Sequence, residues 1–215
     1  MVKAAGKREA LSRERILRAA LEIVDREGLD AISMRRLGEE LGVEAMSLYH
    51  HVANKAAILD GIFETVLAEL PPLSRSASWR TVLSQRARGL RLVLRAHPHA
   101  LPIFATRPAA TEASILHVEV VLDALMKGGF SAEDALSALQ VTAAFVVGHT
   151  VAAYAPVRAD ETSRAVYDHL SEERFPRVRE VARILPRHDL EKEFELGLEA
   201  MIVGIEARLE RKPKR

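Results

Sequence analysis

The sequence contains no cysteine, and that absence removes several kinds of chemistry together. A chain without thiols forms no disulfide, holds no thiolate metal site and offers no cysteine nucleophile. This composition fits a reducing compartment, and we expect a cytoplasmic protein. A marked excess of charge is also missing, because 31 Lys and Arg face 30 Asp and Glu. Net charge therefore does not point to nucleic acid as a partner.

Common catalytic motifs are missing as well. The chain has no G-x-S-x-G, H-E-x-x-H or P-loop motif, so the usual hydrolase and nucleotide-binding sites are not indicated. The histidine pairs His50/His51 and His97/His99 lack a third metal ligand nearby in the sequence. An all-helical enzyme is thus the alternative that we set aside, and we expect no catalytic residue, no metal and no cofactor.

Targeting signals are also lacking. The first eighteen residues carry six Lys or Arg against two Asp or Glu and contain no apolar core of a signal peptide. Such an arm is either a solvated tail or a flexible arm near DNA phosphates. Residues 135–157 hold no charged side chain and are long enough to span a bilayer. Polar residues interrupt this stretch and no basic cluster flanks it, so we expect a buried helix and no membrane partner.

Helical periodicity dominates the chain, and no segment alternates long enough to form a sheet, which predicts an all-α fold. Serine, asparagine and glycine residues mark the expected ends. In the first part of the chain, the expected helices run from Ser12 to Gly28, from Ser33 to Gly42, from Glu44 to His50 and from Asn54 to Pro71. In the rest, they cover about residues 78–97 and 111–127, then run from Ser131 to about Tyr154 and from Leu190 to about Leu209. We expect a proline-interrupted connection at residues 97–108, a mobile loop from Arg158 to Ser171 and a frayed tail at residues 211–215.

The diagnostic unit is residues 33–55, SMRRLGEELGVEAMSLYHHVANK. Two short helices joined through Leu41-Gly42-Val43 match a helix-turn-helix, because glycine permits a positive φ in the turn and the flanking apolar residues set the angle between the helices. In a major groove, the exposed side chains of the second helix would face base edges.

With this spacing the chain resembles the N-terminal domain of the TetR/AcrR family of regulators. Ser78-Trp79, Thr106-Arg107-Pro108, Gly129-Phe130-Ser131 and Gly197-Leu198-Glu199 resemble the tetracycline-repressor-like C-terminal subclass. The resemblance implies a helix-turn-helix DNA-binding domain at residues 1–56 and an effector-binding and dimerisation domain at residues 57–215. It also implies a homodimeric, ligand-responsive transcriptional regulator that binds double-stranded palindromic operator DNA. We expect a repressor, and an activator is the alternative.

The resemblance also implies which residues touch DNA. Arg35 would reach a guanine or a phosphate, and Lys55 would hold a phosphate. The front of the recognition helix would be Glu44, Ala45, Met46 and Ser47, while Tyr49 and His50 would contact the backbone or a thymine methyl group. Ala45 and Met46 stand where the tetracycline-binding members have glutamine and proline, so we expect a different operator.

The resemblance also implies a small-molecule effector in a helical pocket between the fourth helix and the C-terminal core. The candidate lining residues are mostly apolar, as such pockets usually are: Leu67, Leu70, Arg86, Leu90, Ile103, Thr106, His117, Val121 and His149. We expect Arg86 and His117 to be the polar anchors; if Arg86 is buried without an acidic partner, it favours a carboxylate or phenolate. A regulator without an effector is the alternative, and a pocket filled by side chains would distinguish it.

The metal ligands of the tetracycline-binding members are mostly replaced. Their metal-binding histidine falls at Ile103, their asparagine at Arg86, and the carboxylate that organises the metal's water near Ala152, while Thr106 is kept. Mg²⁺ needs oxygen ligands and water, so we expect a mostly hydrophobic effector and not a tetracycline–Mg complex. The helices at 131–154 and 190–209 are apolar enough to predict a four-helix dimer interface, with Gly148 and Gly204 allowing close approach.

Overall fold

The computed structural model describes residues 10–73, 77–154 and 170–210. It divides the chain into two compact units, Met1–Tyr154 and Ala155–Arg215. Every regular element in the described ranges is a helix, which confirms the predicted all-α fold. Three expectations lie outside the described residues: most of the basic arm (residues 1–9), most of the expected mobile loop (residues 158–169) and the frayed tail (residues 211–215).

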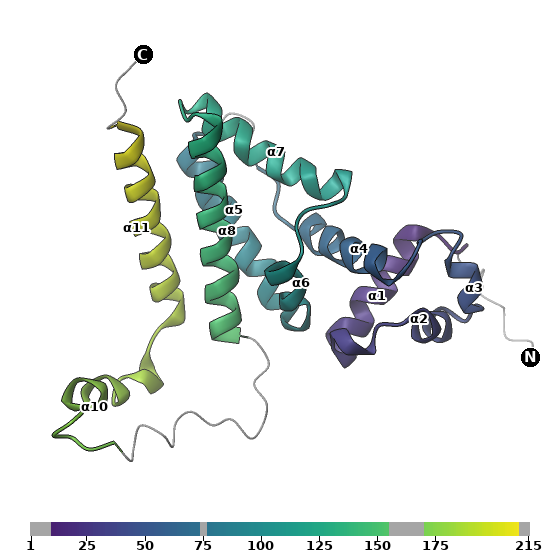
Figure 1. Cartoon of the computed structure of the whole chain (residues 1–215), viewed down its shortest axis with the longest axis horizontal. Coiled ribbons are helices and arrows are strands. Elements are labelled where there is room, and N and C mark those ends of the chain that lie inside the picture. Colours follow the sequence, from purple (N-terminus) through teal and green to yellow (C-terminus); the bar gives the residue numbers. More distant parts are fainter. Residues whose placement is uncertain (1–9, 74–76, 155–169, 211–215) are drawn as a thin grey trace, which may run out of the picture. The chain divides into compact units, whose positions relative to one another are not determined.

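The first unit contains eight α-helices in its described residues, with short 3-10 turns at Leu29–Ala31 and Pro98–Ala100. The helices are α1 (Arg13–Glu27), α2 (Met34–Leu41), α3 (Ala45–Leu48), α4 (Lys55–Ala68), α5 (Trp79–Ala96), α6 (Leu101–Thr106), α7 (Glu112–Lys127) and α8 (Ala132–Tyr154). Helices α1, α2 and α3 gather at one end of this unit, α5, α7 and α8 form the other end, and α4 runs between them (Figure 1).

The predicted N-caps are present. Each capping side chain accepts a hydrogen bond from a backbone N–H two or three residues into its helix, which satisfies a donor that the helix leaves free. The caps are Ser12 on α1, Ser33 on α2, Asn54 on α4, Ser78 on α5 and Ser131 on α8, with donor–acceptor distances of 2.9–3.2 Å. These starts are local features, which is why the sequence predicts them well.

Three helix boundaries differ from expectation. Helix α3 ends at Leu48 rather than His50, and α4 ends at Ala68, three residues before Pro71. The expected connection at residues 97–108 contains helix α6. Its Pro102 lies in the first helical turn, where the missing N–H costs nothing.

The second unit contributes α10 (Pro176–Ala182), a 3-10 turn at Leu185–Arg187 and α11 (Leu190–Glu210) to the described residues. Helix α11 confirms the expected final helix, whereas α10 was not expected. Like α6, α10 begins with a proline in its first turn. Salt bridges from Arg179 and Arg183 to Glu172 hold the start of this unit together.

Helix α8 is long and apolar enough to cross a membrane by length and composition alone, and it is the one such helix in the described ranges. This is weak evidence for a span, because a core helix of a soluble protein passes the same test. Helix α8 packs against α5, α6 and α7. The hydroxyls of its buried Thr142 and Thr150 donate to backbone carbonyls one turn earlier in the same helix, at 2.7 and 2.6 Å.

Candidate DNA interface and effector cavity

The turn between α2 and α3 has the geometry that its sequence predicts. Gly42 adopts a left-handed conformation (φ 66°, ψ 38°), which side chains other than glycine rarely tolerate, and its backbone N–H closes the end of α2. Leu37 of α2 and Leu48 of α3 are completely buried. Helix α3 is only four residues long and packs against α2, so tertiary packing, rather than helix propensity, holds it in place.

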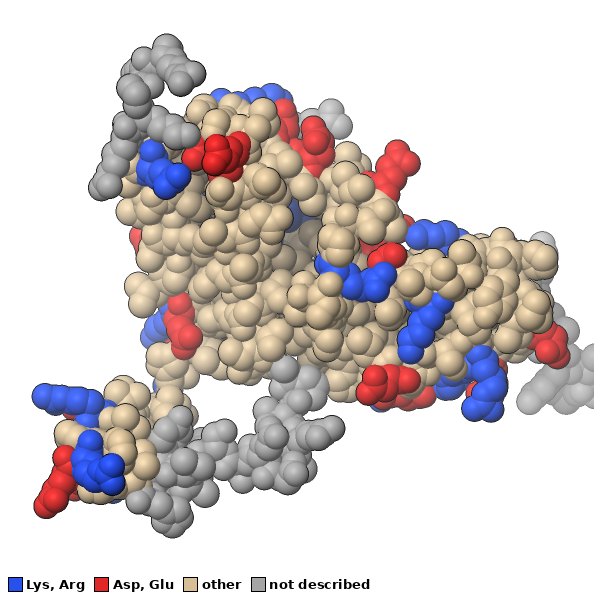
Figure 2. Space-filling model, viewed as in Figure 1, with Lys and Arg blue, Asp and Glu red and all other residues tan. Residues whose placement is uncertain are grey.

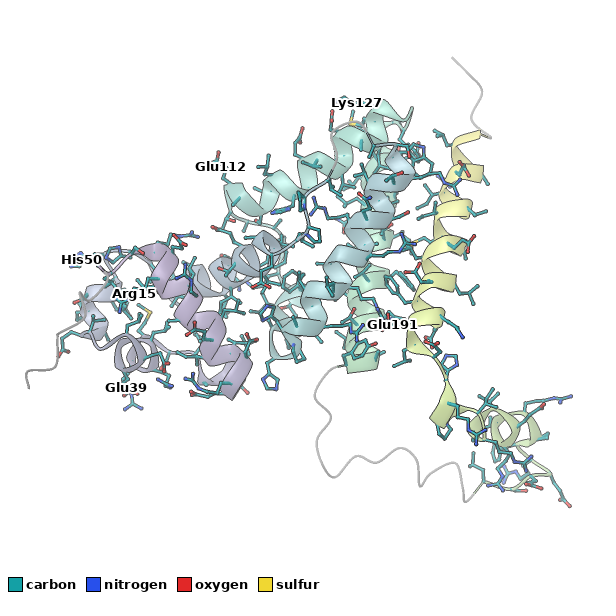
Figure 3. The ribbon with its side chains drawn as sticks, turned by 180° about the vertical axis from the view of Figure 1, so that it is seen from behind. Arg15, Glu39, His50, Glu112, Lys127 and Glu191 are labelled. Atoms are coloured by element: carbon teal, nitrogen blue, oxygen red, sulfur yellow. The ribbon has the colours of Figure 1, made fainter. Side chains whose placement is uncertain are left out.

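The residues expected to touch DNA lie on the surface of this end of the molecule. Met46 is 72% exposed, Tyr49 is 47% exposed, and the Arg35 side chain is 87% exposed. Glu44, His50 and Lys55 are exposed, and Ala45 and Ser47 are partly buried. Figure 3 shows Glu39 of α2 and His50 of the turn after α3 projecting outward from this end. A four-residue helix with an exposed front and one buried anchor can enter a groove without disturbing the core.

The back of the helix-turn-helix is fixed by a charge network between α1 and α2. Arg36 donates to Glu27 through Nε and Nη2, at 3.0 and 2.6 Å, and to Glu40 at 2.7 Å. Arg26 pairs with the same two carboxylates, at 2.8 and 3.0 Å. The hydrogen bonds from Arg36 and then Arg26 lower the pKa of Glu27 to about 2. Four charges are therefore used between the helices and are not available to DNA.

We call the exposed residues expected to touch DNA, Arg35 and those from Glu44 to His50, the reading surface. Helix α4 begins beside it. The Asn54 side chain caps it, accepting from the Ala57 N–H at 2.9 Å, and leaves Lys55 exposed in the first turn. A helix N-terminus with a lysine beside it favours a phosphate. The Arg13 guanidinium of α1 donates two hydrogen bonds to the Glu64 carboxylate of α4, at 3.0 and 2.9 Å.

Helices α4 to α8 enclose a cavity of about 300 Å³. Its lining is mostly apolar: Phe63, Leu67 and Leu70 of α4, Leu90 of α5, Phe104 of α6, Val118 and Val121 of α7, and Leu139, Ala143 and Val147 of α8, with Pro108 and Ala109 between α6 and α7. The rings of Phe63 and Phe104 stack with centroids 4.3 Å apart. In Figure 3, Glu112 and Lys127 mark the two ends of α7, one wall of the cavity.

Four side chains bring polar groups to the lining: Arg86, Arg107, His117 and Gln140. The Nε atom of Arg86 is buried and meets no hydrogen-bond partner in the described part of the chain. Desolvation lowers the pKa of Arg86, and it lowers the pKa of His117 together with the nearby Arg86 cation. The cavity is therefore mostly apolar, and it contains a half-buried arginine whose Nε atom is unsatisfied in the described residues.

Arg107 joins the cavity wall to α4. Its guanidinium pairs with the Asp60 carboxylate, with Nη2–Oδ1 and Nε–Oδ1 distances of 2.6 and 2.8 Å. The same Nη2 donates to the Ala56 carbonyl at 3.3 Å, one residue after Lys55. The connection from α6 to α7 is thus bonded to the DNA-proximal start of α4.

Of the candidate effector residues, the structure brings Leu67, Leu70, Arg86, Leu90, His117 and Val121 together around the cavity. The other three are not in its lining. Ile103 is buried in the core at 1% exposure, and the Thr106 hydroxyl donates to the Pro102 carbonyl at 2.7 Å. His149 lies against Phe145, with ring centroids 5.8 Å apart.

Sequence reasoning missed several lining residues, above all Phe63, Phe104, Arg107 and Gln140. Phe63 shares a helix face with Leu67 and Leu70, because the three residues are spaced i, i+4 and i+7, and this spacing is the signal that could have found it. Phe104 and Arg107 come from the segment that was expected to be an irregular connection, and Gln140 comes from α8. Whether these segments reach the cavity depends on tertiary packing. No carboxylate lines the cavity in the described ranges, so the donor set does not suit Mg²⁺.

Comparisons with known proteins agree across both parts of the chain. The family model for bacterial regulatory proteins of the tetR family matches residues 16–62, and that for the tetracyclin repressor-like C-terminal domain matches residues 71–209. The tetracycline repressor protein class D of Escherichia coli is 34% identical over 206 residues, covering 93% of this chain and 91% of that protein. An HTH-type transcriptional regulator of Saccharopolyspora erythraea is 32% identical over 204 residues, covering 92% and 85%.

Solved structures show the same similarity. The TetR family protein ActR of Streptomyces coelicolor, in complex with (S)-DNPA, has a TM-score of 0.79 at 32% identity, covering 93% of this chain and 98% of ActR. A single-residue variant of TetR from Acinetobacter baumannii, in complex with minocycline, has a TM-score of 0.71 at 25% identity, covering 95% and 98%.

Proposed function

This chain belongs to the TetR family of bacterial regulatory proteins, and on that premise we propose that it is a dimeric repressor, released from a palindromic operator by a mostly hydrophobic effector. Family membership makes it a transcriptional regulator with a helix-turn-helix. Its relatives are DNA-binding regulators rather than enzymes. We further infer that residues 1–56 form the DNA-binding domain and residues 57–215 the effector-binding and dimerisation domain.

One observation carries the proposal: α4 begins at the reading surface and ends at the cavity. Lys55 stands at its exposed start, and Phe63, Leu67 and Leu70 line the cavity farther along. A ligand that fits the cavity only when α4 has moved therefore changes the position of the reading surface. Such a ligand shifts the equilibrium by no more than its difference in affinity between the two arrangements.

Two sets of contacts support transmission of that movement. The pair of Arg107 with Asp60 connects the cavity wall to α4. Helices α4 and α1 are held together by the Arg13–Glu64 fork and by a close approach at Gly61, where an added Cβ would lie 2.2 Å from the Leu17 side chain. Because α1 supports α2 and α3, we infer that the reading surface follows α4 as one body. A coupling of about 1–3 kcal/mol would weaken operator affinity about 5- to 150-fold.

Exposed apolar side chains support the proposed dimer. Leu136 and Val141 of α8 are 50% and 55% exposed, and Leu196 and Val203 of α11 are 70% and 49% exposed. The surface over α8 is largely free of charged side chains in Figure 2, whereas the α1–α4 end carries both signs. An isologous contact with a second copy would remove these apolar side chains from water.

The two glycines expected in the dimer interface are open. A Cβ added at Gly148 or at Gly204 would meet no atom within 4 Å, so each position leaves room for a partner helix. Light scattering at micromolar concentration should give the mass of a dimer. A stable monomer under those conditions would overturn this part of the proposal.

Selection of binding sequences from random DNA tests the DNA half of the proposal. We expect an inverted repeat with half-sites about one helical turn, 34–36 Å, or somewhat more apart, because a two-fold dimer presents two recognition helices to successive major grooves. Selected sequences without any inverted repeat would contradict it. A thermal-shift screen with hydrophobic antibiotics and metabolites then identifies effectors, which should lower operator affinity.

A further inference from the structure

We propose that the effector carries an anionic group, a carboxylate or a phenolate, and that Arg86 binds it inside the cavity. This inference rests on the proposed function, since it names the chemical class of ligand for the same cavity. Its basis is the half-buried Arg86 side chain, whose Nε atom is buried without a hydrogen-bond partner in the described residues, in a lining that is mostly apolar.

Arg86 stands apart from the other cavity arginine. The guanidinium of Arg107 forms an ion pair with Asp60 and donates a hydrogen bond to the Ala56 carbonyl. Within the described ranges, by contrast, Arg86 has neither an acidic partner nor a hydrogen bond at its buried Nε. An arginine stays protonated even when burial disfavours its charge, and a buried charge without a partner is costly. A ligand that supplies the opposite charge removes that cost.

The geometry of a guanidinium narrows the ligand class. Its planar fork matches a carboxylate with two parallel hydrogen bonds, and it accepts a phenolate with one. His117 lies close enough for the Arg86 cation to help lower its pKa. Burial and that cation both disfavour the protonated ring, so we expect His117 to contribute hydrogen bonding to the ligand rather than a second positive charge. The stacked Phe63 and Phe104 rings and the lining leucines would enclose the rest of the ligand.

The test uses matched pairs of bicyclic aromatic acids and their primary amides, beginning with 2-naphthoate and 2-naphthamide. The members of a pair have nearly the same shape and differ in charge. Isothermal titration calorimetry should show the acids binding about 10- to 100-fold more tightly than the amides, the range expected for hydrogen bonds to a charged group. The proposal is overturned if the amides bind as tightly as the acids, or if neither class binds up to millimolar concentration.

Variants assign the preference to Arg86. Arg86→Met should remove the acid preference while leaving or improving the binding of the amides, because a linear apolar side chain keeps the cavity covered. Arg88→Met is the matched control: it removes the same charge from an exposed position on α5 outside the cavity lining, so the preference should remain. A preference that survives Arg86→Met, or that Arg88→Met also abolishes, overturns the assignment.

Failure of this inference is distinguishable from failure of the proposed function. Operator binding is measured by fluorescence anisotropy without any ligand, in the wild type and in Arg86→Met. If the operator binds and a neutral ligand releases it, the proposed function stands and the anion assignment is wrong. If the acids bind with the expected preference but no specific DNA is bound or released, the anion site stands and the proposed function is wrong.

Discussion

The two ends of the first unit differ in how completely their arginines are paired with carboxylates. At the reading end, the arginines and glutamates of α1 and α2 neutralise one another across helices, as in the network of Arg26 and Arg36 with Glu27 and Glu40. At the cavity end, Arg107 pairs with Asp60, but the half-buried Arg86 lies in a mostly apolar lining and meets no acid in the described ranges. Paired charges fix a structure, whereas an unpaired buried charge makes the free energy depend on what fills the cavity.

The same contrast applies to packing. In the helix-turn-helix, Leu37 and Leu48 are completely buried, so core packing helps to fix the positions of α2 and α3. Helices α4–α8 instead leave about 300 Å³ between them. Because the cavity is not filled by side chains, a ligand that occupies it can move the surrounding helices, and the well-packed helix-turn-helix would then move as a unit.

Filling the cavity should produce the largest effect. Leu90→Trp places an indole into the lining and should weaken the binding of an identified effector about a hundredfold or more, at a stability cost of about 1–3 kcal/mol from overpacking. Operator affinity without ligand should be unchanged. Leu92→Trp is the control, because Leu92 is 60% exposed on the same helix. If effector still releases Leu90→Trp from the operator at its wild-type concentration, the cavity is not the effector site.

Removing a base contact comes next. Arg35→Ala should reduce discrimination at one operator position by about 1–3 kcal/mol, if its exposed side chain reads a base. Competition between the selected operator and single-base variants measures this loss. An equal weakening on every sequence would instead assign Arg35 to a phosphate.

Removing a phosphate contact should have a smaller and sequence-independent effect. Lys55→Ala should weaken binding to all DNA and reduce the slope of log affinity against log salt by about one unit. Titrations at several salt concentrations measure the slope. An unchanged slope would place Lys55 away from the DNA.

The pair of Arg107 with Asp60 can be weakened without touching the lining. Asp60→Asn keeps the shape of the side chain and removes its charge, and Asp60 does not line the cavity. Effector affinity should stay close to that of the wild type, while the ratio of operator affinities without and with effector should fall about two- to fivefold, the range for a partly exposed ion pair. Asp123→Asn, which breaks the exposed pair with Lys127, should leave the ratio unchanged. An unchanged ratio in Asp60→Asn would show that the coupling runs elsewhere.

The smallest effect concerns His97, which lies between Asp25 of α1 and Glu69 after α4, at 2.8 and 3.1 Å. Burial lowers its pKa, but the hydrogen bonds to Glu69 and Asp25 outweigh burial and raise the pKa above 6.5. The protonated ring therefore stabilises the fold fully below pH 6.5 and loses this contribution as pH rises through the folded-state pKa.

Thermal unfolding at pH 6 and pH 8.5 checks that sign. His97→Gln should melt about 1–3 °C below the wild type at pH 6, with a smaller difference at pH 8.5. His188→Gln, a half-exposed histidine beside Glu193, is the control and should change little at either pH. A difference that grows with pH would contradict the assignment.

The sequence predicts local features far better than distant ones. The caps at Ser12, Ser33 and Asn54 depend on contacts within four residues, and all three are present. Helix α6 was missed because proline was interpreted as an interruption of the chain, although Pro102 lies in the first turn of the helix. No element was predicted for residues 172–189, where α10 also begins with a proline in its first turn.

The cavity shows the same limit. Leu67 and Leu70 of α4 and Arg86 of α5 were predicted to line it from the family resemblance, and they do. Ile103 and Thr106 were expected beside them but lie outside the lining, because the rotation of α6 is set by its packing on α8. Pairing of Arg107 with Asp60, 47 residues apart, could not be inferred from either segment alone.

The length of α4 has a mechanical consequence. Its 14 residues make a lever of about 21 Å at 1.5 Å per residue, so a tilt of about 10° at the cavity displaces its far end by about 4 Å. Two-fold symmetry would apply that displacement to both reading surfaces in opposite directions. Hydrogen bonds to base edges are lost within a fraction of such a distance. A small movement of the cavity wall would therefore be enough to make the spacing of the two reading surfaces differ from the spacing of the DNA grooves.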